Sequence, residues 1–247
     1  GISGGKDSAA LAIYMSNEFP NLDVSYFFTD TGKELPEVYS FLEKMNARLN
    51  KEIEKLESNF DFDYWLKRHK NFLPSATARW CTVNLKLKPF EKWVQPWLEA
   101  GDRVVNYVAI RADENRKGYV PTNPAIETKF PLSEAGIDRQ GVEKLLDDAG
   151  IGLPKYYKWR SRSGCFFCFY QQKIEWIRLK ERHPDKFEEA KAYEKIVGNG
   201  HSQFTWCEGE SLSELEKPKR VKEITEEFEK RKNKLLSRRK KRSLQNP

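Results

Sequence analysis

Histidine and cysteine are scarce in this chain, and no segment is apolar enough for a membrane. The 247 residues include four cysteines and three histidines. No apolar run approaches the roughly 20 residues that a transmembrane helix needs, and no signal peptide is visible. We therefore exclude a membrane span and expect no disulfides, because these form mainly in secreted proteins. The sequence predicts a cytoplasmic protein.

The three histidines do not indicate a catalytic base. His183 precedes a proline, and neither His69 nor His201 lies in a recognisable pattern. A lone histidine is more often structural than catalytic, even though its pKa suits proton transfer. We therefore predict no histidine base.

Positive charge is concentrated at the end of the chain. From residue 217 onward there are thirteen Lys and Arg and four Glu, so the net charge of this tail is +9. The net charge of the whole chain is +7, so the rest of the chain carries −2. The run at residues 238–242 (RRKKR) could bind the phosphates of a nucleic acid. A solvated helix end with a disordered terminus is equally compatible with it.

A glycine pair near the start of the chain predicts a phosphate-binding loop. The segment SGGKDS opens the apolar run AALAIY, which is typical of a helix. Glycines let successive backbone N–H groups turn inward, and the helix adds its positive end. The segment is not the GxxxxGK[ST] of common nucleotide-binding loops, and a Gly-rich turn that merely caps a helix is the alternative. The predicted phosphate ligands are Ser3, Gly4, Gly5, Lys6, Asp7 and Ser8.

Strands and helices alternate along the first half of the chain. We expect strands at residues 23–28 and 103–110, and a helix from Pro36 through the fifties. This order favours an α/β fold with a parallel sheet sandwiched by helices. Ligands of such sheets bind beyond the carboxyl ends of the strands, so the polar loops SGGKDS, TDTGKE and RADENR should converge. Only Gly1 and Ile2 precede the phosphate loop, and we expect its strand to be missing from this sequence.

Three regions follow from this pattern. We predict a nucleotide-binding domain at residues 1–135, a helical region with a Cys-x-x-Cys site at 136–210, and the basic tail at 211–247. Helices at residues 171–180 and 187–196 are expected in the second region, separated by Pro184.

Four motifs resemble the phosphoadenosine phosphosulfate (PAPS) reductase family of PP-loop ATP pyrophosphatases. They are SGGKDS, the turn Thr29-Asp30-Thr31-Gly32 followed by Pro36-Glu37, Lys86-x-x-Pro89, and RADENR at residues 111–116. The resemblance spans residues 1 to about 195. It implies a Rossmann-like, adenine nucleotide alpha-hydrolase-like fold. It places Asp30, Thr31 and Gly32 in the nucleotide pocket and assigns anion binding to Arg111 and Arg116, although structural ion pairs with Asp113 and Glu114 are the alternative.

The cysteines depart from the reductase pattern. No Glu-Cys-Gly-x-His stretch ends the chain, whereas RWCT followed by RSGCFFC looks more like the ATP pyrophosphatases of DNA phosphorothioation, of the Dnd and Ssp type. That resemblance implies a DNA substrate, more than RNA, and a cysteine desulfurase as sulfur donor. A homodimer stays open. A PAPS or adenylyl-sulfate reductase, a tRNA thiolation enzyme and a non-catalytic defence accessory protein remain alternatives.

The four cysteines are candidate ligands of one inorganic group. Cys-x-x-Cys presents two converging thiolates, and two single cysteines complete four. The resemblance favours a [4Fe–4S] cluster, while zinc and a redox dithiol remain open. The predicted ligands are Cys81, Cys165, Cys168 and Cys207.

The expected chemistry is ATP cleavage to AMP and pyrophosphate. Residues 3–8 would hold the β and γ phosphates with Mg²⁺ bridging them, and Lys6, Asp7 and Ser8 would act in catalysis. An acceptor oxygen would take the adenylyl group, and sulfur would then displace AMP.

Overall fold

The structure is a computed structural model that describes residues 1–116, 118, 120–162, 164–196 and 202–245. It divides into two compact units. Unit 1 comprises Gly1–Lys70 and Thr77–Cys168, and unit 2 comprises Asn71–Ala76 and Phe169–Pro247.

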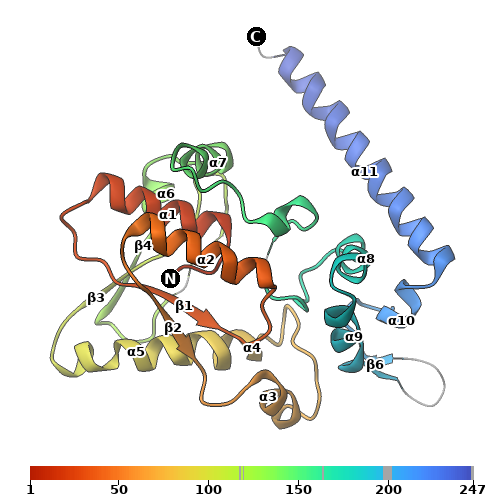
Figure 1. Cartoon of the computed structure of the whole chain (residues 1–247), viewed down its shortest axis with the longest axis horizontal. Helices are drawn as coiled ribbons and strands as arrows, with labels where there is room; N and C mark the ends of the chain where they lie inside the picture. The colour runs from red at the N-terminus through yellow and green to blue at the C-terminus, as the bar shows by residue number, and fades with distance from the viewer. Residues whose placement is uncertain (117, 119, 163, 197–201, 246–247) are drawn as a thin grey trace. The chain divides into compact units, whose positions relative to one another are not determined.

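Unit 1 has the predicted α/β fold. Strand β1 (Tyr26–Asp30) pairs in parallel with β2 (Ile53–Glu57), and β3 (Val104–Tyr107) pairs in parallel with β4 (Ile126–Lys129). Helices flank these strands on both sides, with α1 and α2 on one side and α5 on the other (Figure 1). The helices of unit 1 are α1 (Lys6–Glu18), α2 (Pro36–Leu49), α3 (Phe62–Arg68), α4 (Trp80–Thr82), the π-helical η1 (Val83–Leu87), α5 (Lys88–Glu99), α6 (Pro131–Glu134), α7 (Arg139–Asp148) and the 3₁₀ turn η2 (Lys155–Lys158).

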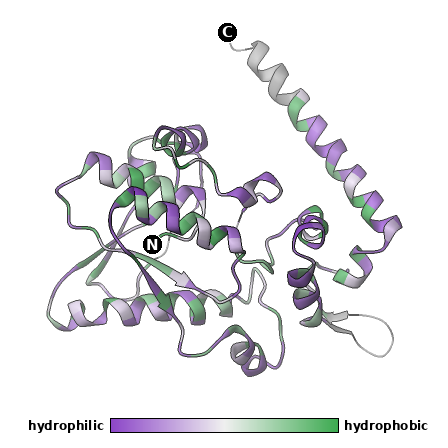
Figure 2. Cartoon of the chain, in the orientation of Figure 1, coloured by the Kyte–Doolittle hydropathy of each residue, from purple (hydrophilic) through white to green (hydrophobic). Residues whose placement is uncertain are grey.

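Apolar packing fixes the helices against the strands. The run of small apolar residues from Ala9 to Ile13 is almost wholly buried, which makes α1 a core helix (Figure 2). On the other side, α5 packs Phe90 and Val94 against Ile126 of β4, and the ring of Phe90 stacks on Phe27 of β1 with centroids 5.1 Å apart.

The prediction of a helix through the fifties is wrong at its end. Helix α2 stops at Leu49 because Asn50 adopts a left-handed conformation with φ +49°, and β2 begins three residues later. Only Ile53 of β2 is buried, so the strand lacks the alternation that would have predicted it. The strand predicted at 23–28 is present as β1, which begins later and extends to Asp30, and the strand predicted at 103–110 is present in shorter form as β3.

The first compact unit reaches further along the chain than residue 135. Helix α7 packs against α1 and buries Val142 and Leu146 completely. The segment between residues 136 and 168 therefore belongs with the strands in unit 1, and the three-part division stays a prediction.

Unit 2 is mainly helical, as predicted for the C-terminal region. Proline 184 begins the second of its helices, because proline suits a first helical position. No helix of the described residues is long and apolar enough to cross a membrane. The elements of unit 2 are α8 (Lys173–Arg182), α9 (Pro184–Ala192), β5 (Lys195–Ile196) paired antiparallel with β6 (Ser202–Phe204), α10 (Leu212–Leu215) and α11 (Pro218–Gln245).

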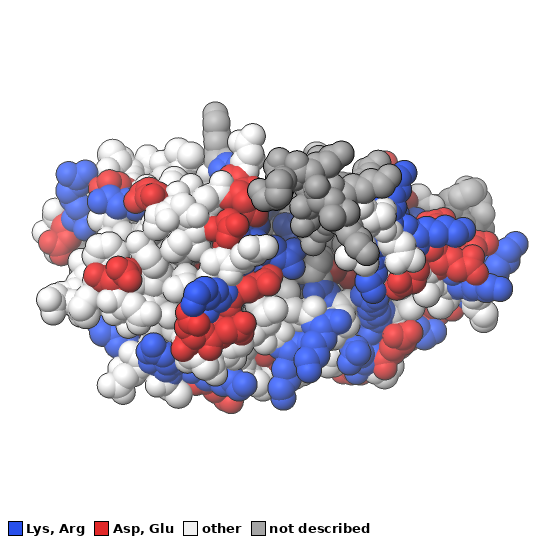
Figure 3. Space-filling view, turned by 90° about the horizontal axis from the view of Figure 1, so that it is seen from above, with Lys and Arg blue, Asp and Glu red and all other residues white. Residues whose placement is uncertain are grey.

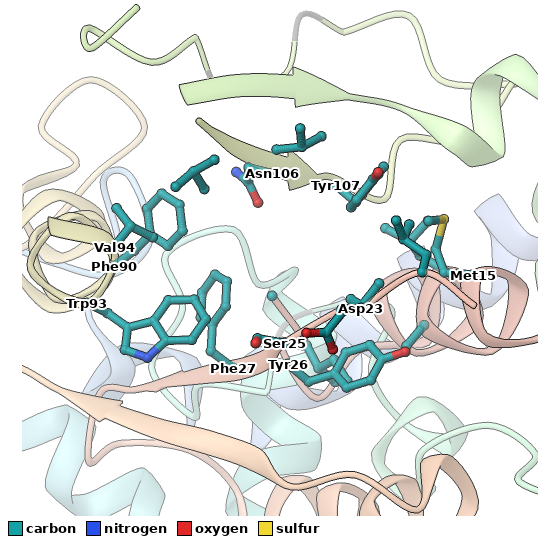
Figure 4. A pocket seen from close by; sticks show the side chains of 18 of the residues that line it. Met15, Asp23, Ser25, Tyr26, Phe27, Phe90, Trp93, Val94, Asn106 and Tyr107 are labelled. Carbon is teal, nitrogen blue, oxygen red and sulfur yellow. The ribbon is translucent and has the colours of Figure 1, made fainter. Parts of the chain in front are cut away.

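A cavity of about 460 Å³ lies in unit 1 between β1 and β3 (Figure 4). Its walls are largely apolar and include Phe27, Phe90, Trp93 and Val94. The N–H of Ile2 donates to the carbonyl of Phe27 at 2.7 Å. The residues before the phosphate loop therefore run alongside β1 at this cavity.

Candidate functional site

The phosphate loop, residues 3–8, folds back onto the start of α1. The N–H of Ser3 donates to Ser8 Oγ at 3.0 Å, and Ser8 Oγ donates to the Gly5 carbonyl at 3.1 Å. Gly5 is the N-cap residue, and no side chain caps the helix. The first amides of an α-helix have no partner inside the helix and carry its positive end. This geometry suits an anion at the helix start, and phosphate binding by residues 3–8 stays a prediction.

Two glycines make room for one valine beside this loop. Gly4 has φ +71°, and a Cβ there would lie 2.5 Å from Val38 Cγ1. A Cβ at Gly164 would lie 2.3 Å from Val38 Cγ2. Contacts this short do not occur in folded proteins, so both positions require glycine. Val38 thus ties the phosphate loop to the segment that holds two cysteines.

An ion-pair chain joins the first and third polar loops. Lys6 Nζ lies 2.5 Å from Asp7 Oδ1, and Arg111 Nη1 lies 2.9 Å from the same oxygen. Arg111 also pairs with Asp113 through Nε at 2.8 Å. Although burial lowers the pKa of Arg111, these carboxylates outweigh it and raise the pKa. The guanidinium therefore stays charged beside the phosphate loop.

Arg116 is placed differently from Arg111. Its guanidinium contacts Glu114 at 3.1 Å and the carbonyl of Ala109 at 3.4 Å, and its side chain is 55% exposed. Arg111 and Arg116 thus form ion pairs with Asp113 and Glu114, the alternative to anion binding that the sequence left open. Anion binding by Arg111 and Arg116 stays a prediction, for which Arg111 has the better position.

The second polar loop uses its side chains to hold its own turn. The carboxylate of Asp30 accepts hydrogen bonds from Gly32 N at 2.8 Å and from Tyr39 Oη at 3.0 Å, and it pairs with Lys55 at 2.9 Å. Thr31 Oγ1 donates to Glu34 Oε1 at 3.0 Å. A nucleotide contact by Asp30, Thr31 or Gly32 stays a prediction.

This second loop also pairs with the cysteine segment, residues 164–168. The N–H of Leu35 donates to Gly164 O and the N–H of Phe166 donates to Lys33 O, each at 2.9 Å. Glu34 and Cys165 thereby form an antiparallel β-bridge. The backbone consequently holds the Cys-x-x-Cys beside the loop that follows β1.

Three of the predicted cysteine ligands share one environment in unit 1. Burial raises the pKa of the Cys81 and Cys165 thiols, and each also interacts electrostatically with Cys168 and with Lys86. Burial lowers the pKa of Lys86, but Glu34, 3.8 Å away, and the three thiols outweigh it and raise the pKa. Lys86 therefore favours the ionised form of these thiols, but burial outweighs it and leaves the pKa of Cys81 and Cys165 raised.

The fourth predicted ligand, Cys207, belongs to unit 2. It is buried, and burial raises the pKa of its thiol to about 12. Among the described residues, no three His, Cys, Asp or Glu side chains are arranged to hold a metal. The four-cysteine ligand set stays a prediction.

Sequence reasoning missed four side chains of this site. Glu34 and Lys86 lie among the thiols, and the hydroxyls of Tyr156 and Tyr157 lie at the phosphate loop. The two tyrosines come from η2, some 150 residues beyond the loop, and no motif marks them. Lys86 does lie in a motif quoted for the resemblance, and Glu34 ends the polar loop TDTGKE, and these were the available signals.

Similar proteins are found among curated sequences and solved structures. Two uncharacterized proteins of Methanocaldococcus jannaschii match the chain: MJ0973 at 25% identity over 195 residues, and MJ0066 at 28% over 193 residues. Each match covers 75% of this chain, but the chain spans only 44% and 39% of these relatives. The crystal structure of phosphoadenylyl-sulfate reductase from Candida auris in its phosphate complex superposes with a TM-score of 0.48 and 15% identity, over 66% of this chain and 77% of that one.

A family model gives the assignment. The model of the phosphoadenosine phosphosulfate reductase domain matches residues 1–124, half of the chain. These residues include the phosphate loop, the turn after β1 and the arginine loop after β3. The chain belongs to the phosphoadenosine phosphosulfate reductase domain family.

Proposed function

We propose that this protein cleaves ATP to AMP and pyrophosphate and transfers the adenylyl group to a substrate oxygen. The observation that carries the proposal is the phosphate loop at the uncapped start of α1, with Lys6, Asp7 and Arg111 joined beside it. Polyphosphates are bound by helix amides, ammonium groups and guanidinium groups. All three are present here, and both cations pair with the same oxygen of Asp7.

The reaction follows from this arrangement. The acceptor oxygen attacks the α phosphorus, the bond from that phosphorus to the bridging oxygen breaks, and pyrophosphate leaves. Lys6 and the helix amides neutralise the charge that develops on the leaving group. The oxygens of Ser3, Asp7 and Ser8 suit Mg²⁺, which would reduce the charge of the β and γ phosphates.

We propose DNA as the substrate class, with sulfur replacing a phosphate oxygen. The RWCT and RSGCFFC motifs support this through their resemblance to phosphorothioation enzymes, and the basic residues of α11 offer phosphate contacts. A persulfide from a cysteine desulfurase would displace AMP, and a second thiol would then cleave the sulfur–sulfur bond. On the face in Figure 3, basic and acidic side chains are intermixed, and the proposal of a polyanion partner rests on the excess of positive charge from residue 217 onward.

We further propose that the cysteines hold an iron–sulfur cluster. The donors fit in kind, because thiols are the usual ligands of such clusters and both Cys81 and Cys165 interact electrostatically with Cys168. Cys207 lies in unit 2 and stays a predicted ligand. Protein purified without oxygen should contain about four iron atoms per chain, and Cys165→Ser with Cys168→Ser should abolish the iron. Stoichiometric zinc without iron would contradict the proposal.

Incubation with ATP labelled at the α phosphate tests the ATP chemistry. We expect AMP as the labelled product, and no AMP from Asp7→Ala with Ser8→Ala. Glu143→Gln, on the surface of α7, serves as a control that should retain activity. Labelled ADP as the product would contradict the proposal, and so would reduction of PAPS to sulfite faster than any ATP cleavage.

A further inference from the structure

Two adjacent tyrosines reach the phosphate loop from η2. Their rings stack with centroids 4.7 Å apart and an interplanar angle of 27°. The hydroxyl of Tyr156 donates to the carbonyl of Gly4 at 3.1 Å, and its side chain is fully buried. Tyr156 therefore fixes the peptide that precedes the helix, and no part of it faces a ligand.

Tyr157 meets the loop at its anion-binding amides. The N–H of Lys6, the first residue of α1, donates to the Tyr157 hydroxyl at 3.4 Å. A Cβ on Gly5 would lie 3.4 Å from the same oxygen. An amide at this helix position has no partner inside the helix and is one that a bound anion would use. The phenol oxygen thus stands at the edge of the space for a phosphate.

The hydroxyl groups of Tyr156 and Tyr157 also hydrogen-bond to each other. Although burial raises the pKa of Tyr157, this bond acts to lower it, so Tyr157 is its acceptor. A phenol oxygen can accept hydrogen bonds and donate its own hydrogen at the same time, which leaves the Tyr157 hydrogen for a ligand. Asp7 and Arg111 both act on this side chain electrostatically, so it faces the same charged cluster as the loop. Burial raises its pKa, which keeps the hydroxyl protonated at neutral pH.

We propose that Tyr157 contacts the nucleotide by donating its hydroxyl hydrogen to a β or γ phosphate oxygen while it accepts the Lys6 N–H. Tyr156 is a positioning residue that acts through the loop backbone. The proposal rests on the proposed function, because it requires the loop to hold the pyrophosphate end of ATP.

Calorimetric titration with ATP, pyrophosphate and AMP distinguishes a direct contact between Tyr157 and a phosphate from a role in stabilising the loop. In Tyr157→Phe the ring and its stacking remain, and we expect about tenfold weaker binding of ATP and pyrophosphate, the loss of one hydrogen bond to a charged group. AMP has neither phosphate and should bind as in wild type. Tyr14→Phe, a hydroxyl deletion further along α1, is the matched control and should change nothing. Tyr156→Phe should lower the melting temperature, because the Gly4 carbonyl loses its partner.

Several outcomes would overturn the proposal. Unchanged binding would make Tyr157 a bystander, and tighter binding would mean that its hydroxyl must leave before phosphate enters. An equal loss for AMP and pyrophosphate would show that it only supports the loop. Absence of ATP and pyrophosphate binding to wild type would also overturn it. If the expected losses occur but wild type releases no AMP from ATP, the proposed function fails while the role of Tyr157 stands.

Discussion

The side chain of Val38 packs against both Gly4 and Gly164, and this packing gives a stability prediction. In Gly164→Ala the new methyl group would meet Val38 Cγ2 and Glu34 Oε2, at 2.3 and 3.0 Å before any relaxation. We expect a loss of about 1–3 kcal/mol in the free energy of unfolding, as for other overpacked sites.

A double-mutant cycle attributes this loss to the valine. In a Val38→Ala background the same glycine substitution should cost clearly less, because the space is already free. Urea unfolding of the four proteins measures both costs. Equal costs in the two backgrounds would place the strain elsewhere.

Glu194 of unit 2 gives a pH dependence. Burial raises its pKa from 4.5 to about 7, although its carboxylate accepts hydrogen bonds from Trp206 N and Leu212 N. A carboxyl whose folded pKa lies above its unfolded value stabilises the protein below the unfolded pKa and loses that contribution as pH rises through the folded one. The free energy of unfolding should therefore fall between pH 4.5 and about 7.

Glu194→Gln isolates this contribution. Thermal unfolding across pH 5 to 8 should show a shallower fall for Glu194→Gln than for wild type. The exposed Glu181→Gln provides the comparison and should follow wild type. Parallel curves for wild type and Glu194→Gln would contradict the assignment.

At the level of residues, sequence patterns identified features whose structure depends only on neighbouring residues in the chain. The phosphate loop could be predicted because a glycine pair and a helix start lie within six residues. Arg111 was singled out by the resemblance of RADENR, and it lies in the loop that follows β3. Tyr157 could not, because its contact with Lys6 depends on how η2 folds back across the domain.

Helix α11 combines a packed start with an exposed end. Ile224 is buried, and Arg178 of α8 lies over the ring of Phe228 at 4.7 Å. Leu235 is 59% exposed. Ile224→Ala should therefore cost about 2–5 kcal/mol, whereas Leu235→Ala should stay within about 0.5 kcal/mol of wild type. Chemical denaturation measures both, and equal losses would mean that the distal half of α11 is also packed.

At the level of elements, start signals were more informative than end signals. Pro36 and Pro184 both begin helices, since a proline at the first turn loses no hydrogen bond. The end of α2 at Asn50 was missed because asparagine adopts the left-handed conformation too seldom to be read as a stop. Strand β2 was missed for the same reason, and its exposed charged residues gave no strand pattern.

The charge distribution of the whole molecule predicts which segment would make the proposed contact with DNA. The structure shows that the tail is helical, as α11, while the side chains of the basic run at 238–242 lie outside the described residues. Deleting residues 237–247 removes five positive charges. Binding to duplex DNA should weaken, and the log–log salt slope should fall by up to about five if every charge meets a phosphate.

A salt titration by fluorescence anisotropy checks this. Replacing the five Lys and Arg by Gln keeps the length of the chain and should have the same effect as the deletion. ATP cleavage should change little in either variant. Identical slopes for wild type and both variants would remove the tail from the interface.

At the largest scale, the fold class was predictable but the arrangement of the cysteines was not. Alternating strands and helices require a parallel sheet with helical cover, whichever side chains they carry. Cysteine ligands depend instead on which distant segments meet. Cys81 and Cys165 share the influence of Lys86 within unit 1, whereas Cys207 lies in unit 2, and no spacing in the sequence indicates that division.

The valine between two glycines also has an evolutionary consequence. Gly4, Val38 and Gly164 come from three separate stretches of the chain but occupy one space. A larger residue at position 4 or 164 is disfavoured until position 38 carries a smaller side chain, because a close-packed interior leaves no room for the added methyl group. Relatives with a residue larger than glycine at position 4 or 164 should therefore carry a side chain smaller than valine at position 38. The three positions should be inherited together, as a signature that links the phosphate loop to the cysteine segment.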